Sequence, residues 1–515
     1  MTKFILSFHI ILFYFQYSYS IDKKNAVNWN NTGSSSNLPS NASIIDLKDF
    51  GLKSDNSTDN SLVIKNAIKA LNGKAGILKI PAGSYLINKT ISIPSNIVIS
   101  GAGSDKTILN FNLNGNGDLF SIQGAATAIS TPVLSGSKKE STTVKVSNAA
   151  NFASGDYAMI KQNATHLLTS NWAYNYFFQL VKIKKISGNE ITFEQPLHLD
   201  YSSSNNPVLV KINPVQQVGI ESLKIKRNDA TSGQTSNLFF NYAVNCWVKG
   251  VELENCNYAH INLQSSANIT LSGNYIHDGF SYGSGGKAYG IVLQFGTSDN
   301  LIVDNIVKHL RHSFLLQAAA NGNVIAYNYS YDPYWTEGWF PVASAGDVVL
   351  HGNYPYANLF EGNIFQNLVI DNSHGINGPY NTFFRNRIES YGIVMNNNSG
   401  DNMNFIANEI TGSGLLKGLY TISGNHTAIG NNIKGSLQNG IVSETSLINK
   451  KYASQIGTPF KVNSWKNDAY IRNGKVIKTN ITTSEPEIKQ EVTPKKTETK
   501  TVKKRKKKCC LKKKK

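Results

Sequence analysis

Apolar and polar residues alternate in short segments that recur along the middle of the chain. In each of these six segments, the residues one and three positions before the last are apolar. The segments are AHINLQ (259–264), YGIVLQ (289–294), HSFLLQ (312–317), GDVVLH (346–351), QNLVID (366–371) and YGIVMN (391–396). Alternation with a period of two indicates a strand with one buried face. The pattern therefore predicts six such strands.

A second repeat, of asparagines, accompanies these strands. The form N-x-x-x-x-N occurs in NLIVDN (300–305), NVIAYN (323–328), NLFEGN (358–363) and NTFFRN (381–386), and looser versions end at Asn274, Asn408 and Asn431. Successive second asparagines lie 31, 23, 35, 23, 22 and 23 residues apart. A period in the low twenties with β-rich units is typical of a solenoid, because each unit buries its apolar face only against the next.

The length of the repeat selects the kind of solenoid. Parallel strands need a crossover, and a coil of about 23 residues has room for short strands and turns without a helix between them. The sequence therefore predicts an all-β fold, a single-stranded parallel β-helix, and the crossover rule makes it right-handed. The asparagines are expected to stack from coil to coil, because each side-chain amide both donates and accepts hydrogen bonds.

Residues 44–87 carry a different pattern. Asp49-Phe50-Gly51 precedes a polar turn at Asp55–Asp59, an apolar stripe near 60–72 predicts a helix, and Pro81-Ala82-Gly83-Ser84-Tyr85 ends a strand. One helix here would cover the open end of the solenoid. The segment resembles the start of the pectate-lyase-like β-helix superfamily, particularly its rhamnogalacturonase and epimerase-like branch. The resemblance implies this fold and an activity on polysaccharides.

The pattern along the chain suggests seven regions. Residues 128–212 break the periodicity and alternate between glycine turns, which predicts a small inserted β module. The predicted regions are a signal peptide (1–20), a linker (21–43), a first β-helix segment with the capping helix (44–127), the inserted module (128–212), the β-helix coils (213–449), terminal strands (450–487) and a disordered lysine-rich tail (488–515).

Charge and the N-terminal segment predict where the protein works. Lys3, an apolar run through Phe15 and small residues at Ser18 and Ser20 are typical of a signal peptide, so we expect a secreted or cell-surface protein. Of the net charge of +18, residues 489–515 contribute 14 Lys or Arg less two Glu, which is +12. That tail is predicted to be either a solvated extension or a tether to an anionic cell-surface polymer or membrane lipid. Nucleic acid is not expected as a partner, and we expect a monomer.

The last residue of each predicted strand should point outward, since the residues one and three positions earlier point inward. Read from coil to coil, this position gives the column Gln264, Gln294, Gln317, His351, Asp371 and Asn396. Neighbouring coils lie about 4.8 Å apart, so His351 and Asp371 are expected side by side on the outer face. A carboxylate can fix the tautomer of a neighbouring histidine, which predicts an acid/base pair. The alternative is a polar ladder that only decorates the sheet.

Further polar and aromatic residues complete the predicted site. The predicted catalytic residues are His351, Asp371, His374 and Arg385. The predicted substrate-binding residues are Gln294, Gln317, Asp347, Asn396, Arg311, Trp335, Trp339 and Tyr356. The three aromatic residues lie in long loops and could present flat faces to sugar rings or only pack the loops onto the coils. Neither a metal nor another cofactor is predicted.

The residue types favour one reaction class over another. A uronate lyase needs a base, a cation and a proton donor, and His351, Arg385 or Arg311, and His374 or a tyrosine could supply them. Asp347 and Asp371 would lie roughly 14 Å apart, too far for a hydrolytic carboxylate pair. Ser373-His374-Gly375 is the only echo of the polygalacturonase motifs.

The sequence therefore predicts a secreted enzyme that cleaves an acidic polysaccharide by β-elimination. The alternatives are an epimerase, a glycoside hydrolase of the polygalacturonase or rhamnogalacturonase type, and a non-catalytic glycan-binding or adhesive β-helix.

Overall fold

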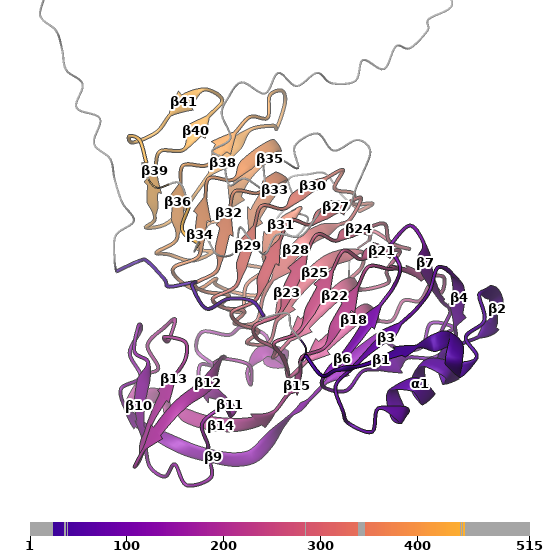
Figure 1. Cartoon of the computed structure of the whole chain (residues 1–515). Coiled ribbons are helices and arrows are strands. Elements are labelled where there is room, and N and C mark those ends of the chain that lie inside the picture. The colour runs from indigo at the N-terminus through magenta and orange to yellow at the C-terminus, as the bar shows by residue number, and fades with distance from the viewer. Residues whose placement is uncertain are drawn as a thin grey trace, which may run out of the picture. The chain divides into compact units, whose positions relative to one another are not determined.

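The computed structural model describes residues 24–34, 38, 40–283, 285–337, 346–442, 444 and 446–448 (Figure 1). The predicted signal peptide (1–20), terminal strands (450–487) and lysine-rich tail (488–515) lie outside the described residues, as does Trp339.

The chain winds through three columns of parallel strands, and this confirms the predicted all-β fold and parallel β-helix. The first column is a 12-stranded sheet of β1 (Ser43–Asp46), β3 (Gly76–Lys79), β6 (Ile97–Ser100), β16 (Gly219–Glu221), β20 (Trp247–Lys249), β23 (Thr270–Ser272), β26 (Leu301–Val303), β29 (Val324–Ala326), β32 (Leu359–Glu361), β34 (Thr382–Phe384), β36 (Asn404–Ile406) and β39 (Thr427–Ile429). The right-handed winding stays a prediction.

The other two columns merge into one 21-stranded sheet. The second column contains β2 (Asp55–Asp59), β4 (Gly83–Ile87), β7 (Thr107–Phe111), β17 (Lys224–Arg227), β21 (Glu252–Glu254), β24 (Tyr275–His277), β27 (Ile306–Lys308), β30 (Tyr329–Tyr331), β33 (Ile364–Ile370), β35 (Arg387–Met395), β37 (Glu409–Ile410), β40 (Asn432–Ile433) and the antiparallel β41 (Ser436–Leu437). The third column contains β5 (Ile91–Ser92), β8 (Phe120–Gln123), β18 (Ser236–Asn241), β22 (Ala259–Gln264), β25 (Tyr289–Gln294), β28 (His312–Leu316), β31 (Val348–Leu350) and β38 (Leu419–Thr421), and it joins the second at β33 and β35.

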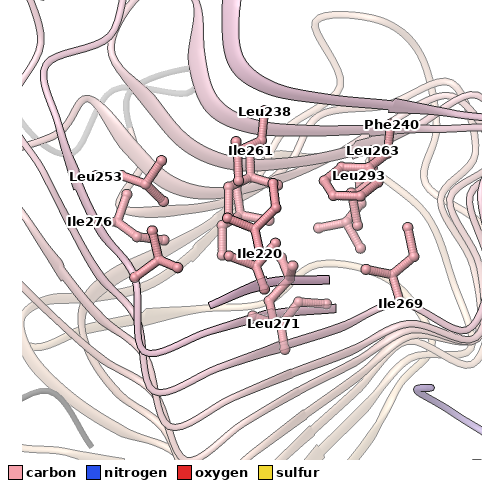
Figure 2. Close-up of a cluster of buried hydrophobic side chains, with 14 of the residues drawn as sticks. Ile220, Leu238, Phe240, Leu253, Ile261, Leu263, Ile269, Leu271, Ile276 and Leu293 are labelled. Carbon is pink, nitrogen blue, oxygen red and sulfur yellow. The ribbon is translucent and has the colours of Figure 1, made fainter. Parts of the chain in front are cut away.

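The interior of the coils is filled by the predicted inward positions. In the third column these are Ile261 and Leu263, Ile291 and Leu293, Phe314 and Leu316, Val348 and Leu350, Leu368 and Ile370, and Ile393 and Met395. Figure 2 shows rows of apolar side chains from successive coils meeting in this core. Removing this apolar surface from water is the main favourable term that holds the coils together.

The predicted asparagine stacking is confirmed. One ladder runs from Asn274 to Asn431, and each side-chain Nδ2 donates to the Oδ1 of the next asparagine at 2.8–3.0 Å. Its members are Asn274, Asn305, Asn328, Asn363, Asn386, Asn408 and Asn431. A second ladder joins Asn300, Asn323, Asn358 and Asn381 at 2.7–2.9 Å. Because these amides are buried, each ladder satisfies polar groups that water cannot reach.

The predicted helix is present as α1 (Ser61–Ala70). Ile64 and Ala67 are buried in the core that the first coils share, whereas Leu62 is exposed, so the apolar stripe is narrower than the sequence pattern suggests. Asp59 accepts a hydrogen bond from the backbone N–H of Ser61 at 2.9 Å at the start of the helix. The role of α1 as a cap stays a prediction.

The region predicted as an inserted module is a closed barrel. It contains β9 (Ala125–Ser135), β10 (Thr143–Val146), β11 (Tyr157–Lys161), β12 (Phe178–Ser187), β13 (Glu190–Phe193) and β14 (Val208–Asn213). The chain then returns to the coils through β15 (Val215–Gln216), which pairs with β19 (Ala243–Val244) of the next coil. Closing the sheet removes the exposed edges that a small module would otherwise carry.

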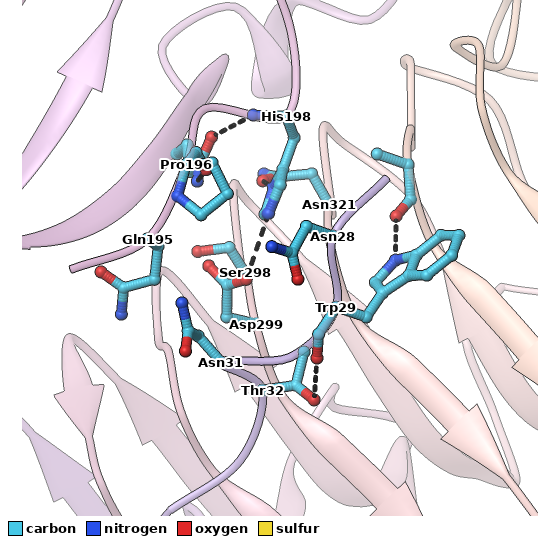
Figure 3. Close-up of polar contacts among 12 residues, drawn as sticks. Asn28, Trp29, Asn31, Thr32, Gln195, Pro196, His198, Ser298, Asp299 and Asn321 are labelled. Carbon is cyan, nitrogen blue, oxygen red and sulfur yellow. Dashed lines mark hydrogen bonds and ion pairs between the residues drawn. The ribbon is translucent and has the colours of Figure 1, made fainter. Parts of the chain in front are cut away.

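Polar contacts fasten the barrel and the N-terminal segment to the coils (Figure 3). His198 Nε2 lies 3.2 Å from Asp299 Oδ1, and His198 Nδ1 lies 2.9 Å from Asn321 Oδ1. Trp29 Nε1 donates to the carbonyl of Ala357 at 2.8 Å. Because these groups are buried and bonded, they fix the barrel against the turns of the β-helix.

Two further observations concern the cysteines and the described helices. Cys246 and Cys256 are buried free thiols. None of the described helices has the length and apolar composition needed to cross a membrane.

The surroundings of His260 predict that the stability of the fold falls in acid. Its Nε2–H donates to the carbonyl of Asp278 at 2.9 Å, and its Nδ1 accepts from Asn237 Nδ2 at 3.1 Å, so the neutral ring satisfies both contacts. Burial lowers the pKa of His260 to about 3. Between that value and about 6.5 the unfolded chain binds the extra proton, so stability falls as the pH falls.

We expect His260→Gln to reduce this pH dependence. The slope of the unfolding free energy against pH between pH 6 and pH 4 should be smaller in the variant by about 1.4 kcal/mol per pH unit. Chemical denaturation at a series of pH values measures both slopes, and equal slopes would show that His260 does not stay neutral in the fold.

Candidate active site

A cleft of about 670 Å³ lies along the outer side of the third column. Its lining comes from strands and loops of four successive coils, from the turn after β33 and from the barrel. The lining residues are Trp172, Gln234, Tyr258, Asn262, Gln264, Gly285, Gly286, Tyr289, Gln294, Phe295, Arg311, Leu315, Gln317, His351, Ser373 and His374. Five of the predicted site residues therefore face one cleft: Gln294, Gln317, Arg311, His351 and His374.

His351 and Asp371 lie side by side, as the register predicts. His351 follows β31, Asp371 follows β33, and these strands pair in parallel from Val348 beside Leu368 to Leu350 beside Ile370. His351 Nδ1 lies 2.6 Å from Asp371 Oδ2. The carboxylate is fully buried behind the ring, which lines the cleft. Asp371 can thus hold the neutral ring with its proton on Nδ1, and Nε2 keeps its lone pair for the cleft.

Ser373 completes the surroundings of this pair. Its backbone N–H and its hydroxyl both donate to Asp371 Oδ1, at 3.0 Å and 2.6 Å. The hydroxyl also lies 3.2 Å from His351 Nδ1, the same nitrogen that Asp371 contacts. A serine nucleophile would instead have to contact Nε2, so this arrangement orients the carboxylate and is not a nucleophilic triad.

His374 is the second histidine of the cleft. Its ring stands edge-on to that of His351, with centroids 4.7 Å apart at 90°. Its Nδ1 lies 3.2 Å from Ser170 Oγ, which comes from the barrel. Burial, together with the neighbouring His351, lowers the pKa of His374. The neutral form of His374 is therefore favoured near neutral pH.

Arg311 supplies the positive charge of the cleft. Only 4% of its surface is exposed, and its NH1 donates to the carbonyl of Gly283 at 2.8 Å. The guanidinium carbon lies 5.7 Å from the ring centres of both Tyr289 and Trp335. Its buried Nε has no partner among the described residues. Such a donor, held between aromatic rings, suits a carboxylate of a ligand.

Amides and phenols form the floor of the cleft. Gln317 Nε2 donates to Gln294 Oε1 at 2.6 Å, and Gln294 Nε2 donates to Asn262 Oδ1 at 3.1 Å. Gln294 Nε2 also lies 3.3 Å from the hydroxyl of Tyr258. Burial raises the pKa of Tyr258 and of Tyr289, so both phenols keep their protons. The floor can therefore donate and accept hydrogen bonds with sugar hydroxyls.

Five predicted site residues lie away from the cleft lining, and for three of them, Arg385, Asp347 and Tyr356, the prediction needs correction. Arg385 occupies a left-handed turn with φ of +52°, and its side chain donates to the carbonyls of Val442 and Glu444, both at 2.8 Å. Asp347 is fully buried, where it accepts from Ser330 Oγ and the backbone N–H of Gln366. Because these groups close over it, Asp347 cannot reach a ligand in the cleft.

Tyr356 is also buried, with its hydroxyl 3.0 Å from that of Tyr201 and its ring stacked on Phe177 of the barrel. It packs the barrel against the coils and offers no face to a sugar. Trp335 contacts Arg311 and is not part of the cleft lining. Asn396 lies one coil beyond Asp371, and its side-chain Nδ2 lies 3.4 Å from Asn372 Oδ1, outside the lining.

The sequence analysis missed several lining residues. Trp172 belongs to the barrel loop between β11 and β12, Tyr258 directly precedes β22, and Tyr289 begins β25. Tyr258 could have been found by extending the outward column beyond the start of its strand. Tyr289 has the parity of the inward Ile291 and Leu293, so the alternation gives no sign of it. No periodic signal connects the barrel with the coils.

A second group of charged residues lies on the second column. The ligand atoms of Glu252, Glu254 and His277 are within 4.8 Å of one another. Lys224 Nζ contacts both glutamates, Lys226 Nζ lies 2.7 Å from Glu254, and His277 Nε2 lies 3.2 Å from Glu252. The carboxylates are thus neutralised by side chains of the protein itself, and the group forms an ion-pair network.

Comparison with known proteins identifies the family to which the chain belongs. The family described as "Rhamnogalacturonase A/epimerase, pectate lyase-like" matches residues 44–309, just over half of the 515 residues. No curated protein matches. Among solved structures, the tailspike gp49 of Pseudomonas phage LKA1 has 16% sequence identity and a TM-score of 0.51, covering 72% of this chain and 64% of the tailspike.

Two further structures are similar. The tailspike gp61 of Pseudomonas phage phi297 has 15% identity and a TM-score of 0.48 over 72% of this chain and 64% of its own. A hyperthermoactive exopolygalacturonase from Thermotoga maritima has 14% identity and a TM-score of 0.37 over 74% of this chain and 75% of its own. This chain thus spans about 64% of the length of the two tailspikes. The match over residues 44–309 shows that the chain belongs to the rhamnogalacturonase A/epimerase, pectate lyase-like family.

Proposed function

We propose that this protein is a secreted enzyme that cleaves an acidic, uronate-containing polysaccharide by β-elimination in the cleft, with His351 as the base. The observation that carries the proposal is the pairing of His351 Nδ1 with the buried Asp371, at 2.6 Å, in a cleft that also contains the partly unpaired Arg311. A base and a carboxylate-binding cation are the two groups that removal of a proton α to a carboxylate requires.

The reaction follows from these groups. Arg311 binds the uronate carboxylate and stabilises the negative charge that develops when the neighbouring carbon loses its proton. His351 Nε2 takes that proton, while Asp371 stabilises the imidazolium that forms. The C4–O bond of the uronate then breaks, a C4–C5 double bond forms, and the leaving oxygen receives a proton. His374 or the phenol of Tyr289 is the donor, since both line the cleft.

The lining favours elimination over hydrolysis. No aspartate or glutamate lines the cleft among the residues that the structure describes, and Asp371 is covered by His351 and Ser373. A glycoside hydrolase needs two carboxyl groups on either side of the scissile bond. The described part of the lining thus offers no exposed carboxyl group that could protonate the leaving oxygen or activate water.

A panel of polysaccharides tests the proposal. Polygalacturonate, rhamnogalacturonan, alginate and glucuronate-containing polymers, with neutral glucans as controls, are incubated with the enzyme. Elimination predicts new reducing ends together with the ultraviolet absorbance of an unsaturated uronate, from acidic polymers only. Reducing ends without that absorbance would indicate hydrolysis, and binding without any product would indicate an adhesive β-helix. Either result would overturn the elimination proposal.

Arg311 should confer the preference for acidic substrates. We expect Arg311→Ala to lower kcat/KM on the acidic polymer by about 10- to 100-fold, the effect of losing a hydrogen bond to a charged group. Arg311→Lys keeps the charge but loses the planar geometry, so its activity should lie between those of the wild type and of Arg311→Ala. Binding of the same three enzymes to the carboxyl-reduced polymer, which cannot undergo elimination, is measured as a control. If Arg311→Ala retained the full preference for the carboxylated form, Arg311 would not bind the carboxylate.

A further inference from the structure

The barrel extends one loop into the cleft. This loop joins β11 to β12 and contains the short 3-10 helix η2 (Asn171–Ala173). The backbone N–H groups of Thr169 and Ser170 both donate to Asn353 Oδ1, at 2.9 Å and 3.1 Å. The contact is close: a Cβ on Gly375 would lie 1.8 Å from Thr169 Oγ1. The loop is therefore held against the turns that carry His351 and His374.

Trp172, within the 3-10 helix of this loop, is partly exposed in the cleft. It lines the cleft beside His374, with ring centroids 5.4 Å apart, and beside Phe295, with centroids 5.8 Å apart. Both neighbours meet it edge to face, at 80° and 79°, and 39% of its surface remains accessible. It does not belong to the buried clusters of the barrel or of the coils. An indole held by edge contacts at a polar cleft can offer its flat face to a ligand.

We propose that the inserted barrel is a substrate-binding element, and that Trp172 stacks on a sugar ring of the polysaccharide next to the His351–Asp371 pair. The proposal rests on the function proposed above for the choice of ligand. Three observations support it: the loop is anchored to the catalytic turns, Trp172 faces the same cleft as His351, and amides that can bind sugar hydroxyls line the rest of that cleft. The barrel thus contributes to substrate specificity.

Stacking predicts an effect on binding more than on chemistry. Trp172→Ala should raise KM for the polymer by about 10-fold, which corresponds to about 1.4 kcal/mol. Its effect on kcat should be smaller, because Trp172 contacts the edge of the His374 ring and leaves the base, His351, and its partner Asp371 in place. Trp172→Phe retains an aromatic face and should recover most of the affinity. Tyr174→Ala is the matched control, since Tyr174 is similarly exposed in the same loop but does not line the cleft.

Binding measured without turnover separates this inference from the proposed reaction. Galacturonate and glucuronate-containing oligomers, from dimer to hexamer, are titrated by calorimetry into His351→Ala and into His351→Ala with Trp172→Ala. The inference predicts weaker binding only when Trp172 is replaced, and no change with Tyr174→Ala. Binding that depends on Trp172 without catalysis by the wild type would overturn the reaction and keep the inference. Equal binding with and without Trp172, or no binding of any oligomer, would overturn the inference.

Discussion

Replacing His351 with alanine is expected to lower kcat on the acidic polysaccharide by about 10²- to 10⁴-fold, the range that a general base contributes. The imidazole is the one group of the described cleft lining whose free nitrogen is oriented by a buried carboxylate. KM should change much less, because the amide floor and Arg311 remain. Initial rates of product formation at several substrate concentrations separate the two parameters.

Two controls distinguish a lost base from a disturbed fold. His309→Ala removes a histidine that also bonds a carboxylate, Asp332 at 2.8 Å, but lies outside the cleft lining, so activity should be retained. Asp371→Asn should lower kcat almost as much as His351→Ala. The new amide would donate to Nδ1 and leave the proton on Nε2, which then cannot accept one. Activity that survives in both His351→Ala and Asp371→Asn would contradict the assignment of the base.

Substituting an asparagine in the middle of the ladder is expected to have the largest effect on stability. Asn328 donates to Asn363 Oδ1 and to the carbonyl of Ile302, and its Oδ1 accepts from the backbone and side chain of Asn305. Asn328→Ala leaves several of these buried groups without partners. Because each such group costs about 1–3 kcal/mol, the unfolding free energy should fall by about 2–5 kcal/mol.

Denaturant titration followed by circular dichroism measures this loss. Asn397→Ala is the control, since Asn397 is exposed on the same coils and belongs to neither ladder. Its unfolding free energy should be within about 0.5 kcal/mol of the wild type. If Asn328→Ala were as stable as Asn397→Ala, the ladders would not contribute to holding the coils together.

The coils could be predicted from the sequence because their signals are local and periodic. The alternation that places Ile261 and Leu263 inside also places Gln264 outside, and the asparagine spacing gives the register between coils. The strand alternation and the asparagine spacing together predict that His351 lies beside Asp371, which is 20 residues further along the chain. The same register places Arg387 beside Glu409, which it contacts at 3.3 Å.

The wrong predictions concern side chains whose direction follows from the periodicity but whose contacts with other segments do not. Asp347 does lie on the outward face of its strand, yet Ser330 and Gln366 of adjoining strands close over it. Arg385 lies in a turn that the C-terminal segment covers, a contact across 59 residues for which the sequence has no signal. Tyr356 faces the barrel, whose position against the coils no repeat encodes. For the same reason the contribution of Trp172 and Ser170 to the cleft could not be predicted.

The masses of the reaction products test the proposed elimination most directly. Wild-type enzyme is incubated with the acidic polymer identified in the panel, and the fragments are analysed by mass spectrometry. Elimination breaks the C4–O bond without adding water, so every new non-reducing end should be lighter by one water than a hydrolytic fragment, and His351→Ala should produce almost none. Fragments that carry the added water, or unsaturated fragments formed equally well by His351→Ala, would contradict the proposed role of His351 in the cleft.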